Sequence, residues 1–398
     1  MARPRTQLGD SHNFGRRVVR RGGRIVKPRP LLWEWLVLSA SSPLRRLLAS
    51  AAKEEGASRD SFAFLPSLKF FSSGHDDGGE VQQIRLEPLP APSPERRHEL
   101  ALVVGRSLAL WSWLGVQDLH WENLVLGADS RGRVVFAPLD VEMILADLSL
   151  PTETKLLPDA DPEYAEVCRH AAGVRRILPQ LGKPISASNL VTAARAYCDM
   201  LAFLDRHARA IAEVFDTLPG LRETPIRVCL RGTGEYVSAR ERPLWPPLLD
   251  AEAEQLARGD IPYFFRLYGK PGIHYYANAS LSRVETLPLK GDVPRLEPLL
   301  RLSNGLRSPS RKKLREDGLF ALLGAFDHGS FSGAVVSEML TVEFGVRSLV
   351  VRLDTGEELR SRRNLRAFVG SVYLPCRCGE VRSVFVPAVT RCRAQSSD

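Results

Sequence analysis

The chain has 398 residues, of which 44% are hydrophobic and 25% charged, so it is long enough for two or three domains and can bury a sizeable core. Lys and Arg outnumber Asp and Glu by 55 to 46, which gives a formal net charge of +9. That excess is compatible with a phosphate-rich ligand or an anionic surface. No zinc finger, basic zipper or aromatic RNA-binding motif accompanies it, so we expect no nucleic-acid partner.

The cysteines and the N-terminus indicate where the chain resides. Six cysteines at irregular spacing do not resemble a disulfide framework and favour a reducing cytosol. Cys376 and Cys378 are too close together for a zinc knuckle, and no histidine lies near them or Cys392, so we expect no zinc there. The basic N-terminus lacks an apolar signal core, and no segment reaches 18 uninterrupted apolar residues. The sequence therefore predicts a cytoplasmic protein without a membrane span.

The N-terminal part predicts strands followed by helices. Residues 16–30 alternate apolar and basic side chains around a Gly-Gly turn, which indicates a β-hairpin. Residues 31–55 have a helical pattern, and the turn formers of 72–80 mark an exposed loop. Residues 96–115 place apolar side chains at three- and four-residue steps, which predicts a buried helix ending at Gly115.

The rest of the chain predicts a pair of strands, a long helix, a basic linker and a further strand-rich segment. Residues 120–145 predict two short strands joined by a turn at 127–133, and residues 189–218 predict one long amphipathic helix. Residues 307–317 resemble a basic linker, and residues 340–361 are strand-rich. We therefore expect an α+β chain with segments 1–95, 96–280 and a less clearly assigned 281–398.

Polar residues in three separate stretches suggest phosphoryl transfer. This chemistry needs a loop over the phosphates, a cation on them, a carboxylate for the acceptor hydroxyl and oxygen ligands for Mg²⁺. The stretch "GDSHNFGR" places Gly9 and Gly15 where backbone can approach phosphate, and Lys27 ends the next predicted strand. Each feature alone has an ordinary structural explanation, as a turn or a solvated charge.

The second and third stretches are harder to explain structurally as a set. In "QDLHWENLVL", Asp118 follows the buried helix and is placed to accept a proton from an attacking hydroxyl. Asn123 offers a neutral oxygen for Mg²⁺, and Asp140, in "APLDVE", offers a carboxylate for the same ion. His120 alone would be read as a hydrogen-bonded structural histidine.

These motifs resemble the kinase-like dehydratase domain of class II lanthipeptide synthetases, the LanM family (domain of unknown function 4135). The family strings "GDSHNxGR", "YKPR", "LGATDLHxENLIA" and "IDLE" stand here as "GDSHNFGR", "VKPR", "LGVQDLHWENLVL" and "LDVE". Further along, "RVCLRGTGEY" and "GDIPYF" are similar to two more family segments. The six motifs fall in the family order between residue 9 and about residue 265.

The resemblance implies a two-lobe fold like that of lipid and protein kinases, with a strand-rich C-terminal extension. It also implies dehydration of Ser and Thr in a ribosomal precursor peptide that carries a leader, by phosphorylation from ATP with Mg²⁺ and then elimination of phosphate. The residues it assigns are catalytic Asp118, His120, Glu142, Arg227 and Thr233; nucleotide-binding Gly9, Asp10, His12, Gly15 and Lys27; and metal-binding Asn123 and Asp140. A basic groove would suit an acidic leader.

The chain also departs from the family. It contains no "CHG" zinc-ligand string of the family's cyclase, so we expect ring closure to need a separate cyclase. The family string "YGWVEF" has no clear counterpart, and the loop begins at residue 9. We expect either a compact stand-alone member or a fragment. The alternatives are a kinase of the aminoglycoside phosphotransferase type without elimination, or a degenerate pseudokinase that binds a peptide.

Overall fold

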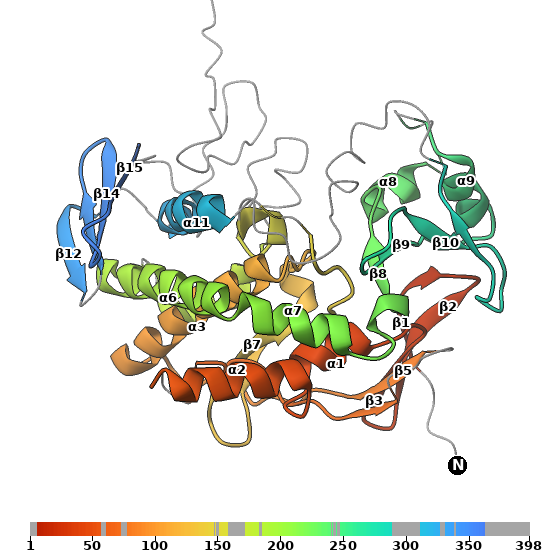
Figure 1. Cartoon of the computed structure of the whole chain (residues 1–398), viewed down its shortest axis with the longest axis horizontal. Coiled ribbons are helices and arrows are strands. Elements are labelled where there is room, and N and C mark those ends of the chain that lie inside the picture. The colour runs from red at the N-terminus through yellow and green to blue at the C-terminus, as the bar shows by residue number, and fades with distance from the viewer. Residues whose placement is uncertain are drawn as a thin grey trace, which may run out of the picture.

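The computed structural model describes residues 6–56, 61–72, 78–146, 148, 151–157, 172–182, 185–239, 241, 244, 247–288, 311–326, 331–337 and 340–362. These residues form the expected mixture of helices and strands (Figure 1). None of the helices in these ranges is both long and apolar enough to cross a bilayer. The C-terminal cysteines at which we expected no zinc lie outside the described residues.

The N-terminal sheet has five strands in the order β1-β2-β3-β5-β4. They are β1 (Thr6–His12), β2 (Arg16–Arg21), β3 (Arg24–Lys27), β4 (Phe70–Ser72) and β5 (Gly79–Gln82). The predicted hairpin is confirmed: β2 and β3 are antiparallel, and Gly22 and Gly23 have φ of 57° and 83°, as a two-residue turn of type I′ requires. The predicted loop at 72–80 is shorter, because its ends belong to β4 and β5.

The helical stretch that follows the sheet forms two helices, α1 (Leu32–Leu38) and α2 (Pro43–Glu54). Ser42 starts the second helix, since its hydroxyl accepts a hydrogen bond from the backbone N–H of Arg45 at 3.1 Å. Pro43 has no N–H to continue the first helix, but it is well suited to the first position of the second.

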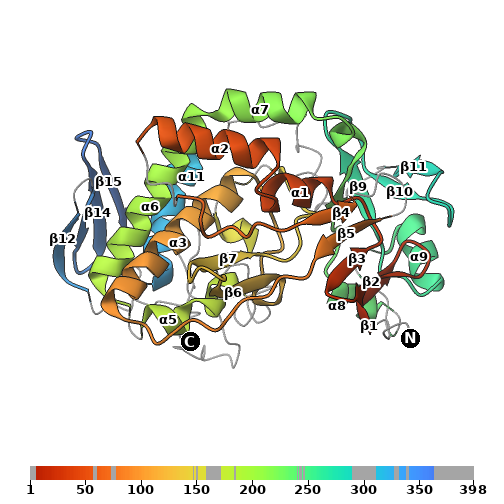
Figure 2. The ribbon, with the colours of Figure 1, turned by 90° about the horizontal axis from the view of Figure 1, so that it is seen from below.

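The middle of the molecule is a helical layer. Its helices are α3 (Pro94–Trp113), α6 (Ala187–Arg206) and α7 (Ala208–Thr217). The helix predicted at 96–115 is confirmed, and Gly115 follows it with φ of 63°. The single helix predicted at 189–218 is wrong. The chain turns at His207, and the centroid of its ring lies 4.7 Å from that of the Phe203 ring. After this turn, α7 runs beside α2 (Figure 2).

A β-hairpin and several short helical turns lie beside α3. The two strands predicted at 120–145 are confirmed as β6 (Leu124–Ala128) and β7 (Val134–Pro138), with a shorter turn than expected because Gly127 and Ala128 belong to β6. The short elements are α5 (Leu178–Leu181) and the 3₁₀ turns η1 (Trp121–Asn123), η2 (Pro151–Thr154), η3 (Gly173–Arg176) and η4 (Leu221–Glu223).

A second sheet lies close to the N-terminal sheet (Figure 1). Its strands are β8 (Pro225–Val228), β9 (Phe264–Leu267), β10 (His274–Tyr276) and β11 (Val284–Thr286), in the order β11-β10-β9-β8. The helices α8 (Thr233–Ser238) and α9 (Asp250–Ala257) belong to the same part of the chain. A small apolar cluster that includes Val228, Ala251 and Phe264 supports it.

The C-terminal part is a helix and a third sheet. The basic segment predicted as a linker at 307–317 is wrong from residue 311 onward, because α11 (Arg311–Phe326) begins there and buries Leu319, Leu322 and Phe326. Residues 307–310, the first four of the basic segment, lie outside the described ranges. The strands predicted at 340–361 are confirmed as β13 (Leu340–Phe344), β14 (Ser348–Leu353) and β15 (Glu358–Arg362). They form an antiparallel meander with β12 (Gly333–Ser337), which was not predicted.

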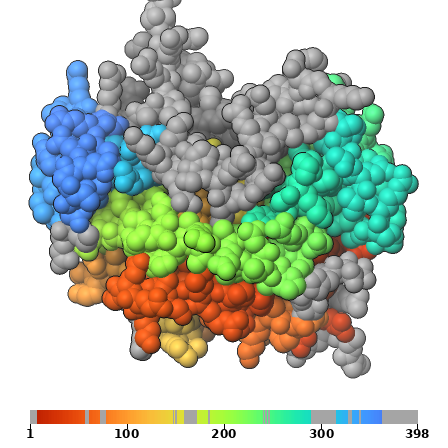
Figure 3. Space-filling view, in the orientation of Figure 1, coloured from red at the N-terminus to blue at the C-terminus, as the bar shows by residue number. Residues whose placement is uncertain are grey.

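One large apolar core joins these parts. Buried residues from Leu32 in α1 to Val351 in β14 belong to a single contiguous cluster. On the surface, α6 and α7 form a band above α2, between the C-terminal sheet and the β8–β11 sheet (Figure 3). The predicted segments 1–95, 96–280 and 281–398 therefore all contribute to the same core.

Candidate active site

A buried ion pair joins the N-terminal sheet to the first helix. Lys27 is the last residue of β3, and Pro28 and Pro30 lead directly into α1, so Glu34 lies in the first turn of that helix. The Lys27 ammonium donates to the Glu34 carboxylate at 2.9 and 3.1 Å, and to the backbone oxygen of Leu139 at 2.9 Å. Both side chains are buried, so each charge depends on the other.

Arg29 is the centre of the polar network. Its guanidinium contacts Glu34 and Asp140, and its Nε lies 3.0 Å from the Glu142 carboxylate. Asp140 is also 3.7 Å from the Lys27 ammonium. Burial acts to lower the pKa of Arg29, but Asp140, Glu34 and Glu142 outweigh it and raise the pKa. Arg29 therefore remains charged and holds three carboxylates together.

The two carboxylates nearest Arg29 have opposite pKa shifts. Burial, and the adjacent Asp140 carboxylate, raise the pKa of Glu34 against the effect of Arg29 and Lys27. Burial acts in the same direction on Asp140, but Arg29 and Lys27 outweigh it and hold the pKa of that carboxyl well below its usual range. Asp140 is therefore ionised at neutral pH, as a metal ligand must be.

The predicted catalytic loop forms a second group beside this network. Asp118 lies between α3 and η1 with φ of 64°, a left-handed conformation that is costly for a residue with a side chain. The Asn123 amide nitrogen donates to the backbone oxygen of Asp118 at 2.9 Å and to its carboxylate at 3.0 Å. Lys155 lies 3.2 Å from the same carboxylate, and His120 lies 3.9 Å from it. These contacts fix the direction of the Asp118 side chain.

Backbone pairing links the catalytic loop to Asp140. The N–H of Leu139 donates to the backbone oxygen of Asn123 at 2.7 Å, next to the last pair of the β6–β7 ladder. Since the Asn123 amide nitrogen is used by Asp118, its side-chain oxygen is the atom left for a cation. The sequence prediction that Asn123 and Asp140 lie close together therefore has a direct structural basis in this hairpin.

Glu142 and Arg227 form a third group. Arg227, in β8, donates from Nη1 to the Glu142 carboxylate at 2.5 Å, and its backbone N–H donates to the Glu142 backbone oxygen at 2.8 Å. Burial opposes the charge of Arg227, but Glu142 raises the pKa of the guanidinium well above its usual value. Among the described residues, the buried Nε of Arg227 has no hydrogen-bond partner. Such an unpaired donor is suited to an anionic ligand.

Thr233, which the resemblance assigns to the same step as Arg227, makes no hydrogen bond to this group in the described structure. It is the exposed first residue of α8, and its hydroxyl makes no hydrogen bond within the described residues. Two other residues of the same motif anchor the segment: Arg231 Nε and the Tyr236 hydroxyl both donate to the buried Glu252 carboxylate, at 3.0 and 2.7 Å. The motif is therefore partly structural.

The "GDSHNFGR" loop lies against the "GDIPYF" segment. His12 donates from Nδ1 to the backbone oxygen of Ile261 at 2.8 Å, since a carbonyl only accepts. Burial, and then the Arg227 guanidinium, lower the pKa of His12, whereas Glu142 and Asp10 act in the opposite direction. The ring is thus neutral at pH 7, with its Nε2 unprotonated, and it packs against the Tyr263 ring, over which the Arg227 guanidinium also lies.

We expected the backbone of this loop to approach phosphate, but two of its N–H groups already have a partner within the protein. The backbone N–H groups of Phe14 and Gly15 donate to the Asp260 carboxylate, at 2.7 and 2.9 Å. Those two amides bind a protein carboxylate in this structure. Gly9 lies in a bulge of β1 with φ of 70°, and Gly9, Asp10 and Gly15 are all exposed.

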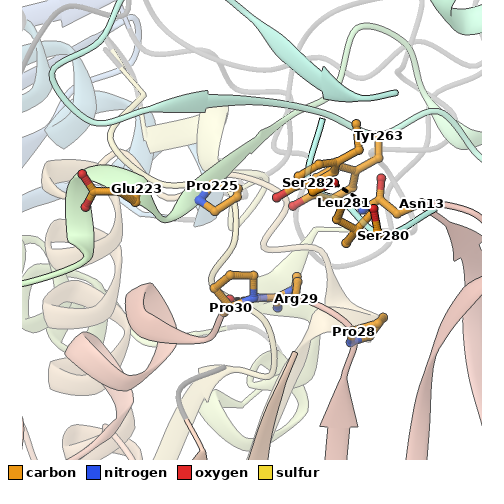
Figure 4. A pocket seen from close by; sticks show the side chains of 11 residues that line it. Asn13, Pro28, Arg29, Pro30, Glu223, Pro225, Tyr263, Ser280, Leu281 and Ser282 are labelled. Carbon is orange, nitrogen blue, oxygen red and sulfur yellow. Dashed lines mark hydrogen bonds between the residues drawn. The ribbon is translucent and has the colours of Figure 1, made fainter. Parts of the chain in front are cut away.

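A cleft of about 340 Å³ opens beside the network. Figure 4 shows Pro28, Arg29 and Pro30 on one side of it, and Tyr263 with the loop Ser280–Ser282 on the other. The Arg29 side chain is only 12% exposed, so it forms part of the cleft wall without leaving its carboxylate partners. The cleft gives a small polar group access to the buried network.

Sequence reasoning missed three residues that the fold places in or around the site. Arg29 stands in the "KPR" motif, in which the resemblance assigns a role only to the lysine. Glu34 is the single charged residue of "LLWEWLVL", and a lone acid in an apolar helix was a usable signal. Asp260 stands in the "GDIPYF" string, but only the fold reveals its partners.

The comparisons with known proteins add no identification: no protein-family model matches the sequence, and no curated protein matches it.

Proposed function

We propose that the chain is a kinase-like peptide dehydratase of the lanthipeptide type, which phosphorylates Ser or Thr of a precursor peptide from ATP and then eliminates the phosphate. One observation carries the proposal. Arg29 contacts both Asp140, which the resemblance assigns to phosphorylation, and Glu142, which it assigns to elimination, so the residues of the two steps share one network. A phosphate installed on the Asp140 side would need to move only a short way to meet Arg227.

Support for the kinase half comes from the pairing of Lys27 with Glu34. A strand lysine paired with a helix glutamate is also required in protein kinases, where it positions the nucleotide phosphates. In the first step Asp118 accepts the proton of the Ser or Thr hydroxyl, whose oxygen bonds to the γ-phosphorus while ADP leaves. The exposed edge of the Gly9–Gly15 loop and Lys27 would lie toward the nucleotide.

The residues present suit Mg²⁺ bound together with a nucleotide. Within the described residues, no group of three or more His, Cys, Asp or Glu side chains could hold a metal alone. Mg²⁺ is ordinarily held by one or two carboxylates plus substrate phosphates and water, and the ionised Asp140 with the side-chain oxygen of Asn123 fits that pattern. The ion would neutralise charge on the transferred phosphate.

Elimination follows from the second half of the network. A base removes the Cα proton, the electron pair forms the Cα–Cβ double bond, and the Cβ–O bond breaks as phosphate departs. Arg227, with its unpaired Nε, and the exposed Thr233 hydroxyl stabilise the leaving phosphate. Glu142 is held by two guanidinium groups and is a weak base. We therefore assign the proton to the neutral Nε2 of His12, although the resemblance groups His12 with the nucleotide-binding residues.

The proposal also defines the setting of the reaction. The substrate is a ribosomal peptide whose acidic leader would bind basic surface, and ring closure belongs to a separate cyclase. The reaction would take place in the cytoplasm, where ATP is available. Residues 1–95 and 96–280 correspond to the two lobes of the kinase-like fold.

Peptide mass tests the proposal directly. The purified protein is incubated with Mg-ATP and the Ser/Thr-rich peptide encoded nearest its gene. Loss of one water per modified residue supports the dehydratase, and Asp118→Asn should abolish it. Arg227→Ala should leave phosphopeptide accumulating. Gain of phosphate alone by the wild-type protein would indicate the kinase without elimination, and an unchanged peptide would indicate a pseudokinase.

A further inference from the structure

One buried carboxylate close to the site takes no part in the chemistry proposed above. Asp260 lies in the turn after α9 and is fully buried. It accepts hydrogen bonds from the Ser11 hydroxyl at 2.7 Å, the Phe14 N–H at 2.7 Å, the Gly15 N–H at 2.9 Å and Arg258 Nε at 3.1 Å. Burial acts to raise its pKa, but these donors outweigh burial and lower the pKa. Asp260 is therefore an ionised anchor for the loop.

The loop that Asp260 holds is conformationally strained. Asn13, Phe14 and Gly15 have φ of 47°, 68° and 81° in succession. Left-handed conformations at two consecutive residues with side chains are unfavourable and persist only where surrounding contacts enforce them. The Asp260 bonds supply that enforcement, and the Arg258 guanidinium stacks 3.9 Å above the Phe14 ring. Without Asp260, the loop would relax to a different shape.

The same anchor fixes His12. The backbone N–H of Ile261, the residue after Asp260, donates to the Ser11 oxygen at 2.8 Å, and His12 Nδ1 donates to the Ile261 oxygen at 2.8 Å. The His12 ring packs edge-on against the Tyr263 ring, with 6.0 Å between the ring centroids, and the Arg227 guanidinium lies 5.6 Å from the same Tyr263 ring. Arg227 and Glu142 from the network and Asp10 from its own strand are the charged groups that act on the imidazole. Movement of the loop would carry the ring away from them.

We propose that Asp260 is a positioning residue: by holding loop 11–15 in its strained shape, it sets His12 against the Tyr263 ring, over which Arg227 also lies, in the tautomer that leaves Nε2 free to accept a proton. Its effect on catalysis rests on the proposed dehydratase function, whereas its effect on His12 does not. The phosphorylation residues Lys27 and Asp118 make no contact with Asp260 in the described structure.

The kinetic test separates the two steps. Asp260→Asn keeps the shape of the side chain but removes its charge, and its amide cannot accept from all four donors. We expect it to slow conversion of a synthetic phosphoserine peptide by about tenfold to a hundredfold and, because the Gly9–Gly15 loop also faces the nucleotide in the proposed function, to slow phosphorylation from Mg-ATP by clearly less. Asp250→Asn, an exposed acid at the start of α9, is the matched control and should alter neither step.

A spectroscopic test needs no substrate. In ¹⁵N-histidine-labelled protein, His12 should be Nδ1-protonated and titrate below the ordinary histidine value. In Asp260→Asn its pKa should rise toward about 6.5 and the tautomer preference should weaken. Ser11→Ala removes one of the donors to Asp260, so it should change the pKa and the tautomer preference of His12 in the same direction but to a smaller extent. It replaces Asp260→Asn in this test if that variant does not fold.

The outcomes are distinct. An unchanged His12 spectrum in Asp260→Asn, or in Ser11→Ala if the first variant is unfolded, overturns the proposal. So does an equal loss of both reaction steps. If the wild-type protein modifies no peptide, the proposed function fails, and the His12 spectrum still decides whether Asp260 positions the ring.

Discussion

At the scale of single residues, the site is a set of buried charges that depend on one another. Lys27 and Arg29 are held by Glu34 and Asp140, and each of these charges would be costly to bury alone. The network therefore stabilises the fold only while every member is present.

Glu34→Gln tests this dependence. Burial raises the pKa of Glu34 and offsets part of what its charge contributes, but the amide would leave the Lys27 and Arg29 cations with one carboxylate partner fewer. We therefore expect the change to lower the free energy of unfolding by about 3 kcal/mol and to impair phosphorylation. Glu80→Gln is the control, since Glu80 pairs with Arg24 at 2.6 Å on the surface and should cost at most about 1 kcal/mol. Urea denaturation of both variants measures the difference, and equal costs would contradict the account.

The lowered pKa of His12 predicts a pH-dependent stability. Below about pH 6.5, His12 becomes protonated in the unfolded chain but stays neutral in the folded chain. Proton binding therefore favours the unfolded state, and the free energy of unfolding decreases as the pH is lowered. His12→Gln lacks this contribution. The difference in free energy of unfolding between wild type and His12→Gln should therefore become less favourable to wild type from about pH 7.5 to about pH 5.5. A difference that stays constant or moves the other way would show that His12 is not buried in its neutral form.

Motif reasoning predicted several site residues and missed others for physical reasons. Lys27, Asp118 and Asp140 carry chemistry whose residue types and order are visible in a sequence. Glu34 and Asp260 act through contacts that only folding creates, the second across 249 positions to Ser11. A local pattern does not encode such a partner.

At the scale of elements, α3 packs closely against α6, and α3 ends shortly before the loop that carries Asp118. Gly105 of α3 lies against the backbone of α6, where a Cβ would come within 2.1 Å of the Ala193 oxygen and 2.9 Å of the Ala196 Cβ. The glycine therefore permits the two helices to approach, at the cost of lower helix propensity.

Gly105→Ala should destabilise the protein by about 2–3 kcal/mol or more, because overpacking outweighs the gain in helix propensity. Gly234→Ala in α8, where a Cβ would meet nothing within 4 Å, should instead stabilise it by up to about 1 kcal/mol. Thermal unfolding of the pair is the measurement. A stabilised Gly105→Ala variant would mean that the helices are farther apart than described.

Element boundaries were predictable where the signal was local. The Gly-Gly hairpin, the buried helix ending before Gly115 and the β6–β7 pair all followed from turn chemistry and periodicity. The break at His207 and the helical start of α11 did not, because packing decides both. The basic residues from Arg311 join a helix whose apolar end is buried in the core.

At the scale of the whole molecule, one core brings distant parts of the chain to one place. Loop 11–15 and Lys27 belong to the N-terminal sheet, Asp140 and Glu142 follow β7, and Arg227 lies in β8. Arg29 contacts Asp140 and Glu142, Glu142 binds Arg227, and Asn13 of the loop lines the same cleft as Arg29. The α+β class was predictable from composition and pattern, but this convergence required the folded structure.

The most direct test of the central claim, that one network carries two separable steps, is the mass of a synthetic phosphoserine peptide incubated with Mg²⁺ and ADP. Wild type and Asp118→Asn should both convert it to the dehydroalanine peptide, because the phosphate is already installed. Arg227→Ala should leave it intact. Unchanged phosphopeptide with the wild-type protein, or equal conversion by Arg227→Ala, would contradict the account.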